Sequence, residues 1–166
     1  MEDYLRRVNY YETDKMGITH HSNYIRYMEE ARVHFLEQLG YSYARQEREG
    51  LISPVTGIDC QYKHSSSFND LIRIRVRVRD YNGVKLTVGY TMTKQDTGEL
   101  LFTGTSQHCY IDGAGRPSFC ESRARPWMRC CAGKRKRTRR KQHDTLLHRH
   151  RQQPSSGPDS GGEIGG

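Results

Sequence analysis

A short polar segment near the N-terminus gathers side chains that could carry out acid–base or nucleophilic chemistry. It covers residues 11–24 and reads YETDKMGITHHSNY. A carboxylate in a loop directly after a strand can act as a general base towards water or as a nucleophile towards an acyl carbon. Asp14 has this position, since residues 4–12 favour a strand and residues 13–17 favour a loop. We therefore predict that Asp14 is a catalytic carboxylate.

A helix that starts directly after this loop would complete such a site. The first turn of a helix has unpaired backbone N–H groups and the positive end of the helix dipole, which suit the developing oxyanion of a thioester carbonyl. Residues 21–23 would supply these N–H groups, and the His21 ring could orient the thioester or the attacking water. Gly17 permits the backbone turn that brings Asp14 near the helix start. This chemistry can be written without a metal or cofactor.

The spacing of apolar residues predicts a helix of about 17 residues behind the site. Ser22 or Asn23 would be its N-cap, and Gly40 would stop it. Apolar residues recur between these ends at Tyr24, Tyr27, Met28, Ala31, Phe35 and Leu39. Ile25, Val33 and Leu36 broaden the apolar surface, so we expect this helix to pack on a sheet along most of its length.

Four strands are predicted after the helix, around residues 55–68, 72–79, 84–92 and 99–111. The second is the clearest, because Ile and Val alternate strictly with Arg73, Arg75, Arg77 and Arg79. Asn82-Gly83 suits a type I′ hairpin turn to the next strand. The order of strand, helix and four strands predicts an α+β hot-dog fold, in which an antiparallel sheet wraps around one long central helix.

Charge divides the 166-residue chain into two parts. Residues 1–120 hold 15 Lys and Arg against 15 Asp and Glu, whereas residues 121–166 hold 12 against 4. The formal net charge of +8 therefore lies in the second part, so the predicted domain, residues 1–120, lacks the positive field of a nucleic-acid-binding domain. Residues 121–166 are predicted to be a disordered basic tail. Its basic run could also be a localisation signal or a nucleic-acid patch, and an aberrant coding end is a further alternative.

Other features of the composition indicate a cytoplasmic protein. No apolar stretch approaches the roughly 18 residues of a membrane span, and the first residues lack the apolar core of a signal peptide. The five Cys have no paired CxxC spacing, so we expect reduced thiols. His20, His64 and His108 lack the spacing of metal ligands, so no metal site is expected.

The motif E-T-D-x-x-G-x-x-x-H-x-N-Y, followed by E-x-A-R in the predicted helix, resembles the signature of the 4-hydroxybenzoyl-CoA/acyl-CoA thioesterase family. The resemblance covers about residues 5–117. It implies hydrolysis of an acyl-CoA to the free acid and CoA without a cofactor, with Asp14 as the catalytic carboxylate. It places His21 where family members have His or Tyr. It also implies a homodimer or homotetramer with active sites at the subunit interface.

The same resemblance suggests substrate-binding residues. Gly17, Asn23 and Tyr24 match its motif. After the second strand the family commonly has an aromatic residue, a basic residue and then Pro, whereas this chain has Ser65 at the position of the Pro. We expect Lys63 and Ser65 to contact the pantetheine or the phosphates of CoA.

Two other functions remain open from the sequence. One is a hydratase or dehydratase of acyl thioesters with the same fold. The other is a nucleic-acid-binding module that uses the basic tail and the four strand arginines, since guanidinium groups pair well with phosphate. The chain has no GxSxG motif, so a thioesterase of the Ser-His-Asp kind is not expected.

Overall fold

The structure is a computed structural model that describes residues 1–118. The predicted tail, residues 121–166, lies outside the described residues. The elements run in the order β1 (Tyr4–Arg7), a 3-10 turn η1 (Tyr10–Glu12), α1 (His21–Gln38), α2 (Tyr43–Arg48), β2 (Val55–Tyr62), β3 (Leu71–Tyr81), β4 (Lys85–Lys94) and β5 (Leu100–Cys109). The strands form one antiparallel sheet in the order β1-β3-β4-β5-β2.

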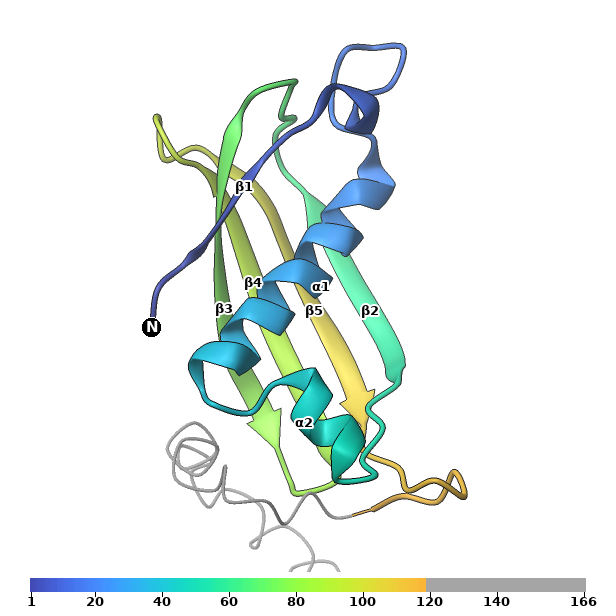
Figure 1. Cartoon of the computed structure of the whole chain (residues 1–166). Helices are drawn as coiled ribbons and strands as arrows, with labels where there is room; N and C mark the ends of the chain where they lie inside the picture. Colours follow the sequence, from blue (N-terminus) through green and yellow to red (C-terminus); the bar gives the residue numbers. More distant parts are fainter. Residues whose placement is uncertain (119–166) are drawn as a thin grey trace, which may run out of the picture. The chain divides into compact units, whose positions relative to one another are not determined.

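The helix α1 crosses one face of this sheet, and the core lies between the two (Figure 1). Most apolar side chains of α1 that recur at helical spacing are buried, as the sequence predicts: Tyr24, Tyr27, Met28, Ala31, Phe35 and Leu36. The predicted burial is only partial for Leu39 and Val33 and is wrong for Ile25, which is 38% exposed because it lies on the side of α1 away from the sheet. They meet inward side chains of the sheet such as Ile72, Ile74, Tyr90 and Phe102. Burying each large apolar side chain stabilises the fold by about 1.5–3 kcal/mol. The predicted hot-dog fold is therefore confirmed.

The start of α1 differs from the prediction. The N-cap is His20, in an extended conformation, rather than Ser22 or Asn23. The His20 N–H donates to the Glu12 carbonyl oxygen (2.8 Å), which keeps the chain extended up to this point. The other end is as predicted, since Gly40 has a φ of 69° just after the helix.

The predicted alternation in β3 is confirmed. Ile72 and Ile74 are buried, whereas Arg75, Arg77 and Arg79 are exposed. The predicted type I′ turn to β4 is wrong, because such a turn needs two central residues with positive φ and only Gly83 (98°) has one. The Asn82 side chain instead accepts hydrogen bonds from the N–H groups of Val84 and Lys85. These bonds stabilise a different turn.

Two strands are shorter than predicted, and one short helix was not predicted. Strand β1 is short, because residues 10–12 form a 3-10 turn. Strand β2 ends at Tyr62, well before residue 68. A six-residue helix, α2, stands in a polar segment without an apolar pattern, and the Ser42 side chain caps it. None of the helices within residues 1–118 is long and apolar enough to cross a membrane.

Candidate active site

Asp14 lies in a tight loop between η1 and α1, at the same end of the sheet as the connection from β2 to β3 (Figure 1). An isolated bridge pairs Thr13 with Thr19 and closes the loop. Inside it, the Asp14 N–H donates to the Ile18 carbonyl (2.9 Å), and the Gly17 N–H donates to the Asp14 carbonyl (2.9 Å). Gly17 has a φ of 75°, which glycine adopts readily. This geometry agrees with the turn predicted for Gly17.

The Asp14 side chain is half-buried and only partly engaged. Its Oδ1 accepts a hydrogen bond from the Met16 N–H (2.8 Å). Within residues 1–118, Oδ2 has no hydrogen-bond partner. One oxygen therefore orients the carboxylate, while the other is available to take a proton or to attack an acyl carbon.

The Asp14 loop is bonded directly to the start of α1. The carbonyl oxygen of Glu12 accepts two hydrogen bonds, from the His20 N–H (2.8 Å) and from the Asn23 side-chain amide (2.8 Å). Asn23 is only 6% exposed. Its amide thus holds the loop against the helix, and its predicted contact with substrate stays a prediction.

His21 is the first residue of the 18-residue helix α1. Its backbone N–H has no hydrogen-bond partner among the described residues, and the Ser22 N–H makes only a long bond to His20 Nδ1 (3.4 Å). The prediction that Asn23 also offers a free N–H is wrong, because this N–H donates to the His20 carbonyl (2.9 Å). The His21 ring is exposed and packs beside the His20 ring, with centroids 4.2 Å apart. The start of α1 thus offers an unpaired donor together with the positive end of the helix dipole.

A buried group of three hydroxyls joins the connection from β2 to β3 to the end of the Asp14 loop and to α1. The Ser66 hydroxyl lies 2.9 Å from the Tyr24 hydroxyl and 2.7 Å from the Thr19 hydroxyl. Tyr24 is 3% exposed, so its hydroxyl is part of the buried structure that holds the site together. Lys63 and Ser65 lie in the same connection and are exposed, and their predicted contacts with CoA stay predictions.

Tyr62, the last residue of β2, also contacts the start of α1. Its hydroxyl donates to the His21 carbonyl (3.2 Å), and its ring meets the rings of Tyr24 and Phe102 at centroid distances of 5.6 and 5.4 Å. It is 47% exposed. The sequence gives no signal for the contacts of Tyr62 or Ser66, because each is an ordinary residue in its own local pattern. Glu12 is the first residue of the E-T-D motif, but the motif does not indicate that its side chain is buried.

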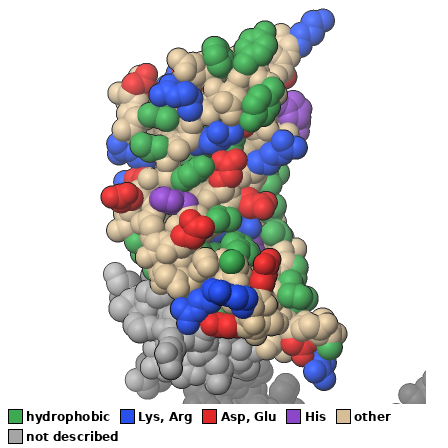
Figure 2. All heavy atoms as spheres, viewed as in Figure 1, with side chains coloured by type: hydrophobic (Ala, Val, Ile, Leu, Met, Phe, Trp, Pro, Cys, Tyr) green, Lys and Arg blue, Asp and Glu red, His purple; other side chains and the backbone are tan. Residues whose placement is uncertain are grey.

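Large apolar side chains are exposed around the Asp14 loop. Tyr10, Tyr11 and Met16 are each at least 75% exposed, and Phe68 packs edge-on against Tyr10. Figure 2 shows hydrophobic side chains at this upper end of the molecule. This end is therefore suited to contacts with an apolar ligand or with another chain.

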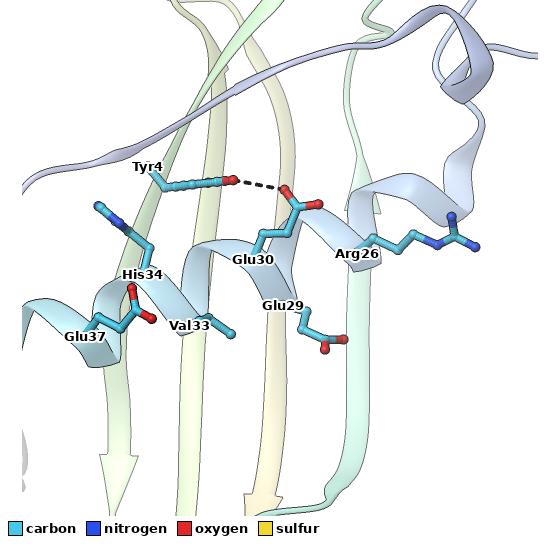
Figure 3. A pocket seen from close by; sticks show the side chains of 7 residues that line it. All are labelled: Tyr4, Arg26, Glu29, Glu30, Val33, His34 and Glu37. Carbon is cyan, nitrogen blue, oxygen red and sulfur yellow. Dashed lines mark hydrogen bonds between the residues drawn. The ribbon is translucent and has the colours of Figure 1, made fainter. Parts of the chain in front are cut away.

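A groove of about 530 Å³ lies elsewhere, on the outward face of α1 (Figure 3). It is lined by Tyr4, Arg26, Glu29, Glu30, Val33, His34 and Glu37. Its three carboxylates would repel the phosphates of CoA. None of the residues predicted for the site lines it, so we do not assign the substrate to this groove.

Within residues 1–118, no group of three or more His, Cys, Asp or Glu side chains is arranged to hold a metal ion.

Known proteins share both the sequence pattern and the fold. A family model described as the thioesterase-like superfamily matches residues 8–146. A Bacillus subtilis protein named "Putative acyl-CoA thioesterase YneP" is 37% identical over 105 residues, which are 63% of this chain and 75% of that protein.

Solved structures also match this chain in sequence and fold. A hypothetical protein from Thermus thermophilus matches with a TM-score of 0.70 and 31% identity, over 75% of this chain and 94% of that chain. DHNA-CoA thioesterase from Staphylococcus aureus matches with a TM-score of 0.68 and 32% identity, over 71% and 79%. The names of these relatives support thioester hydrolysis as the general activity. Because the family match spans most of the chain and the fold agrees with it, this chain belongs to the thioesterase-like superfamily.

Proposed function

We propose that this protein is an acyl-CoA thioesterase that hydrolyses an acyl-CoA to the free acid and CoA without a cofactor. One observation carries the proposal. A carboxylate with a free oxygen, on Asp14, lies in a loop bonded to the first turn of α1, where the His21 N–H is unpaired. Thioester hydrolysis needs these two groups, a base or nucleophile and a donor for the oxyanion.

The reaction can follow two routes with the same groups. In the first, Asp14 Oδ2 takes a proton from water while the water oxygen attacks the thioester carbon. In the second, Asp14 attacks that carbon itself, and water then hydrolyses the resulting anhydride. In both routes the C–S bond breaks, CoA leaves as the thiolate, and the His21 N–H stabilises the oxyanion.

The remaining predicted residues have supporting roles in this proposal. Gly17 shapes the loop, Asn23 holds the Asp14 loop against α1, and Tyr24 holds the connection from β2 to β3 against α1. Lys63 is exposed and positively charged in the connection from β2 to β3, which suits the CoA phosphates, and Ser65 lies two residues further along. We also propose that, within the superfamily, the protein is related to the 4-hydroxybenzoyl-CoA thioesterases.

We also propose that the protein acts as a homo-oligomer with active sites at the subunit interface. Strand β2 is at the edge of the sheet, and it exposes Val55, Ile58 and Tyr62. An exposed apolar edge strand favours pairing with a second chain. Because Tyr62 contacts the start of α1, such pairing would bring the partner close to the site.

The test is release of free thiol from a panel of acyl-CoAs by the purified protein. Aromatic, short and long acyl chains are compared, with heat-denatured protein as the background. We expect at least one acyl-CoA to be hydrolysed with saturation kinetics, without added metal or cofactor. If the folded protein hydrolyses none of them, the proposed function is wrong.

A further inference from the structure

Glu12 is a buried carboxylate two residues before Asp14, and it is the first residue of the E-T-D motif, although the motif alone assigns it no role. It is 4% exposed. Both of its oxygens are engaged, Oε1 by Arg6 Nη2 (2.6 Å) and Oε2 by the Asn9 N–H (2.7 Å). A buried carboxylate is strongly destabilising unless it is paired and hydrogen-bonded. These contacts offset that cost, and they leave Glu12 unable to reach a substrate.

The partner of Glu12, Arg6, makes two further contacts. Arg6 lies on β1, and its Nε is 3.2 Å from Glu30 Oε2. Its guanidinium also lies over the Tyr27 ring, 5.2 Å from the centroid. Burial, and then the neighbouring Glu12 carboxylate, raise the pKa of Tyr27. The Glu12 side chain is thereby anchored to β1 and to the packed face of α1.

The backbone of the same residue is anchored to the other side of the site. The Glu12 carbonyl accepts the His20 N–H and the Asn23 amide, both in the region where α1 begins. The Thr13–Thr19 bridge closes the loop directly after it. Glu12 therefore links β1, the Asp14 loop and the start of α1.

We propose that Glu12 is a positioning residue, whose buried ion pair with Arg6 sets the place of the Asp14 carboxylate relative to the His21 N–H. This inference rests on the proposed function. Catalytic groups must be held within a fraction of an ångström, since a misplacement of about 1 Å can cost about 100-fold in rate. A charge pair in the interior fixes such a position better than a loop alone, because the pair has one favourable geometry.

The test is the substitution Glu12→Gln, measured by thiol release with the acyl-CoA that the wild type hydrolyses best. Gln keeps an acceptor for the Asn9 N–H but removes the charge partner of Arg6. We expect kcat to fall about 10- to 100-fold and KM to change less than about 3-fold. Glu30→Gln is the matched control, because it removes the other, more exposed carboxylate at Arg6 and should leave kcat unchanged.

A double variant separates positioning from general damage. If Glu12 acts through Asp14, Glu12→Gln combined with Asp14→Asn should be no slower than Asp14→Asn alone. If the two losses multiply, or if folded Glu12→Gln keeps the wild-type kcat, the inference is wrong. If Glu12→Gln does not fold, Arg6→Lys is tested in its place, with the same expected fall in kcat and the same comparison with Asp14→Asn. This variant keeps the charge of Arg6 but loses the fork of donors. An inactive wild type would contradict the proposed function instead.

Discussion

Asp14 and the His21 N–H are the two groups on which the proposed chemistry depends. Asp14 has one oxygen fixed by the Met16 N–H and one free oxygen. His21 contributes through its backbone, and its exposed ring makes no hydrogen bond within residues 1–118. Its backbone and ring roles can therefore be separated by substitution.

The substitution His21→Pro should remove the oxyanion donor while the helix remains. Proline is favoured at the first position of a helix, and the preceding His20 is already extended (φ −60°, ψ 133°), as a residue before proline must be. We expect kcat to fall about 100- to 1,000-fold, as for the loss of one oxyanion donor. His21→Ala, which keeps the N–H, should lose much less. Equal rates for the two variants, at equal helix content by circular dichroism, would contradict the role of the N–H.

The buried His108 should make the stability of the fold depend on pH. It is buried, with its Nε2 2.7 Å from the Ser106 hydroxyl and 3.4 Å from Arg32 Nη1. Burial, and then the charge of Arg32, lower the pKa of His108 from 6.5 to about 4. Between these values the unfolded chain binds a proton that the folded chain does not, so stability falls as the pH drops from 6.5 to 4. The loss is about 3 kcal/mol over this range.

Denaturant unfolding at pH 7 and at pH 4.5 measures this effect. His108→Gln should reduce the difference in unfolding free energy between the two pH values, whereas the exposed His64→Gln should preserve it. An unchanged difference in His108→Gln would show that other groups cause the pH dependence.

At the scale of elements, the connection from β2 to β3 is held to α1 by a few buried hydroxyls. Ser66 is fully buried and links Thr19 to Tyr24. Its backbone N–H also donates to the Tyr24 hydroxyl (3.2 Å). The exposed Lys63 and Ser65 belong to this connection, so their placement depends on Ser66.

The substitution Ser66→Ala should therefore lower both stability and substrate affinity. We expect a loss of about 1–3 kcal/mol in unfolding free energy, because two buried hydroxyls lose a partner. KM should rise more than kcat falls, since the connection carries the predicted CoA contacts. Ser67→Ala, at the next residue, should change stability by less than about 0.5 kcal/mol. Thermal unfolding and steady-state kinetics measure both effects, and equal stability losses in the two variants would exclude this role of Ser66.

The elements predicted from the sequence are those with strong periodicity. The helix α1 and strands β3, β4 and β5 follow from local patterns. The spacing of Asp14, Gly17 and His21 within one segment leads to a loop next to a helix start, which the structure has, whereas their roles stay predictions. Ser66 could not be found in this way, because its partner Thr19 is 47 residues away. The true N-cap, His20, was missed for a similar reason, since its N–H is fixed by the Glu12 carbonyl across the loop.

For the whole molecule, the main expectation is assembly through the edge of the sheet. Strand β2 pairs only with β5 within residues 1–118, and Ile58 at its centre is 44% exposed. A charged side chain on an edge strand opposes pairing between sheets. We expect Ile58→Lys to convert a homo-oligomer into monomers and to lower activity. Light scattering after size exclusion tests this. Leu5→Lys is the control, because it places the same charge at an exposed apolar position of the other edge strand, β1, and should leave assembly unchanged. A monomeric active wild type would contradict the expectation.

The central claim is that the Asp14 carboxylate carries out thioester hydrolysis. Its most direct test is kcat/KM for thiol release by Asp14→Asn, compared with Asp96→Asn, which removes an exposed carboxylate in the turn between β4 and β5. We expect Asp14→Asn to fold normally and to lose about 100- to 10,000-fold in kcat/KM, as for the loss of a general base, while Asp96→Asn keeps the wild-type value. A folded Asp14→Asn variant with the wild-type kcat/KM would contradict the catalytic role of Asp14.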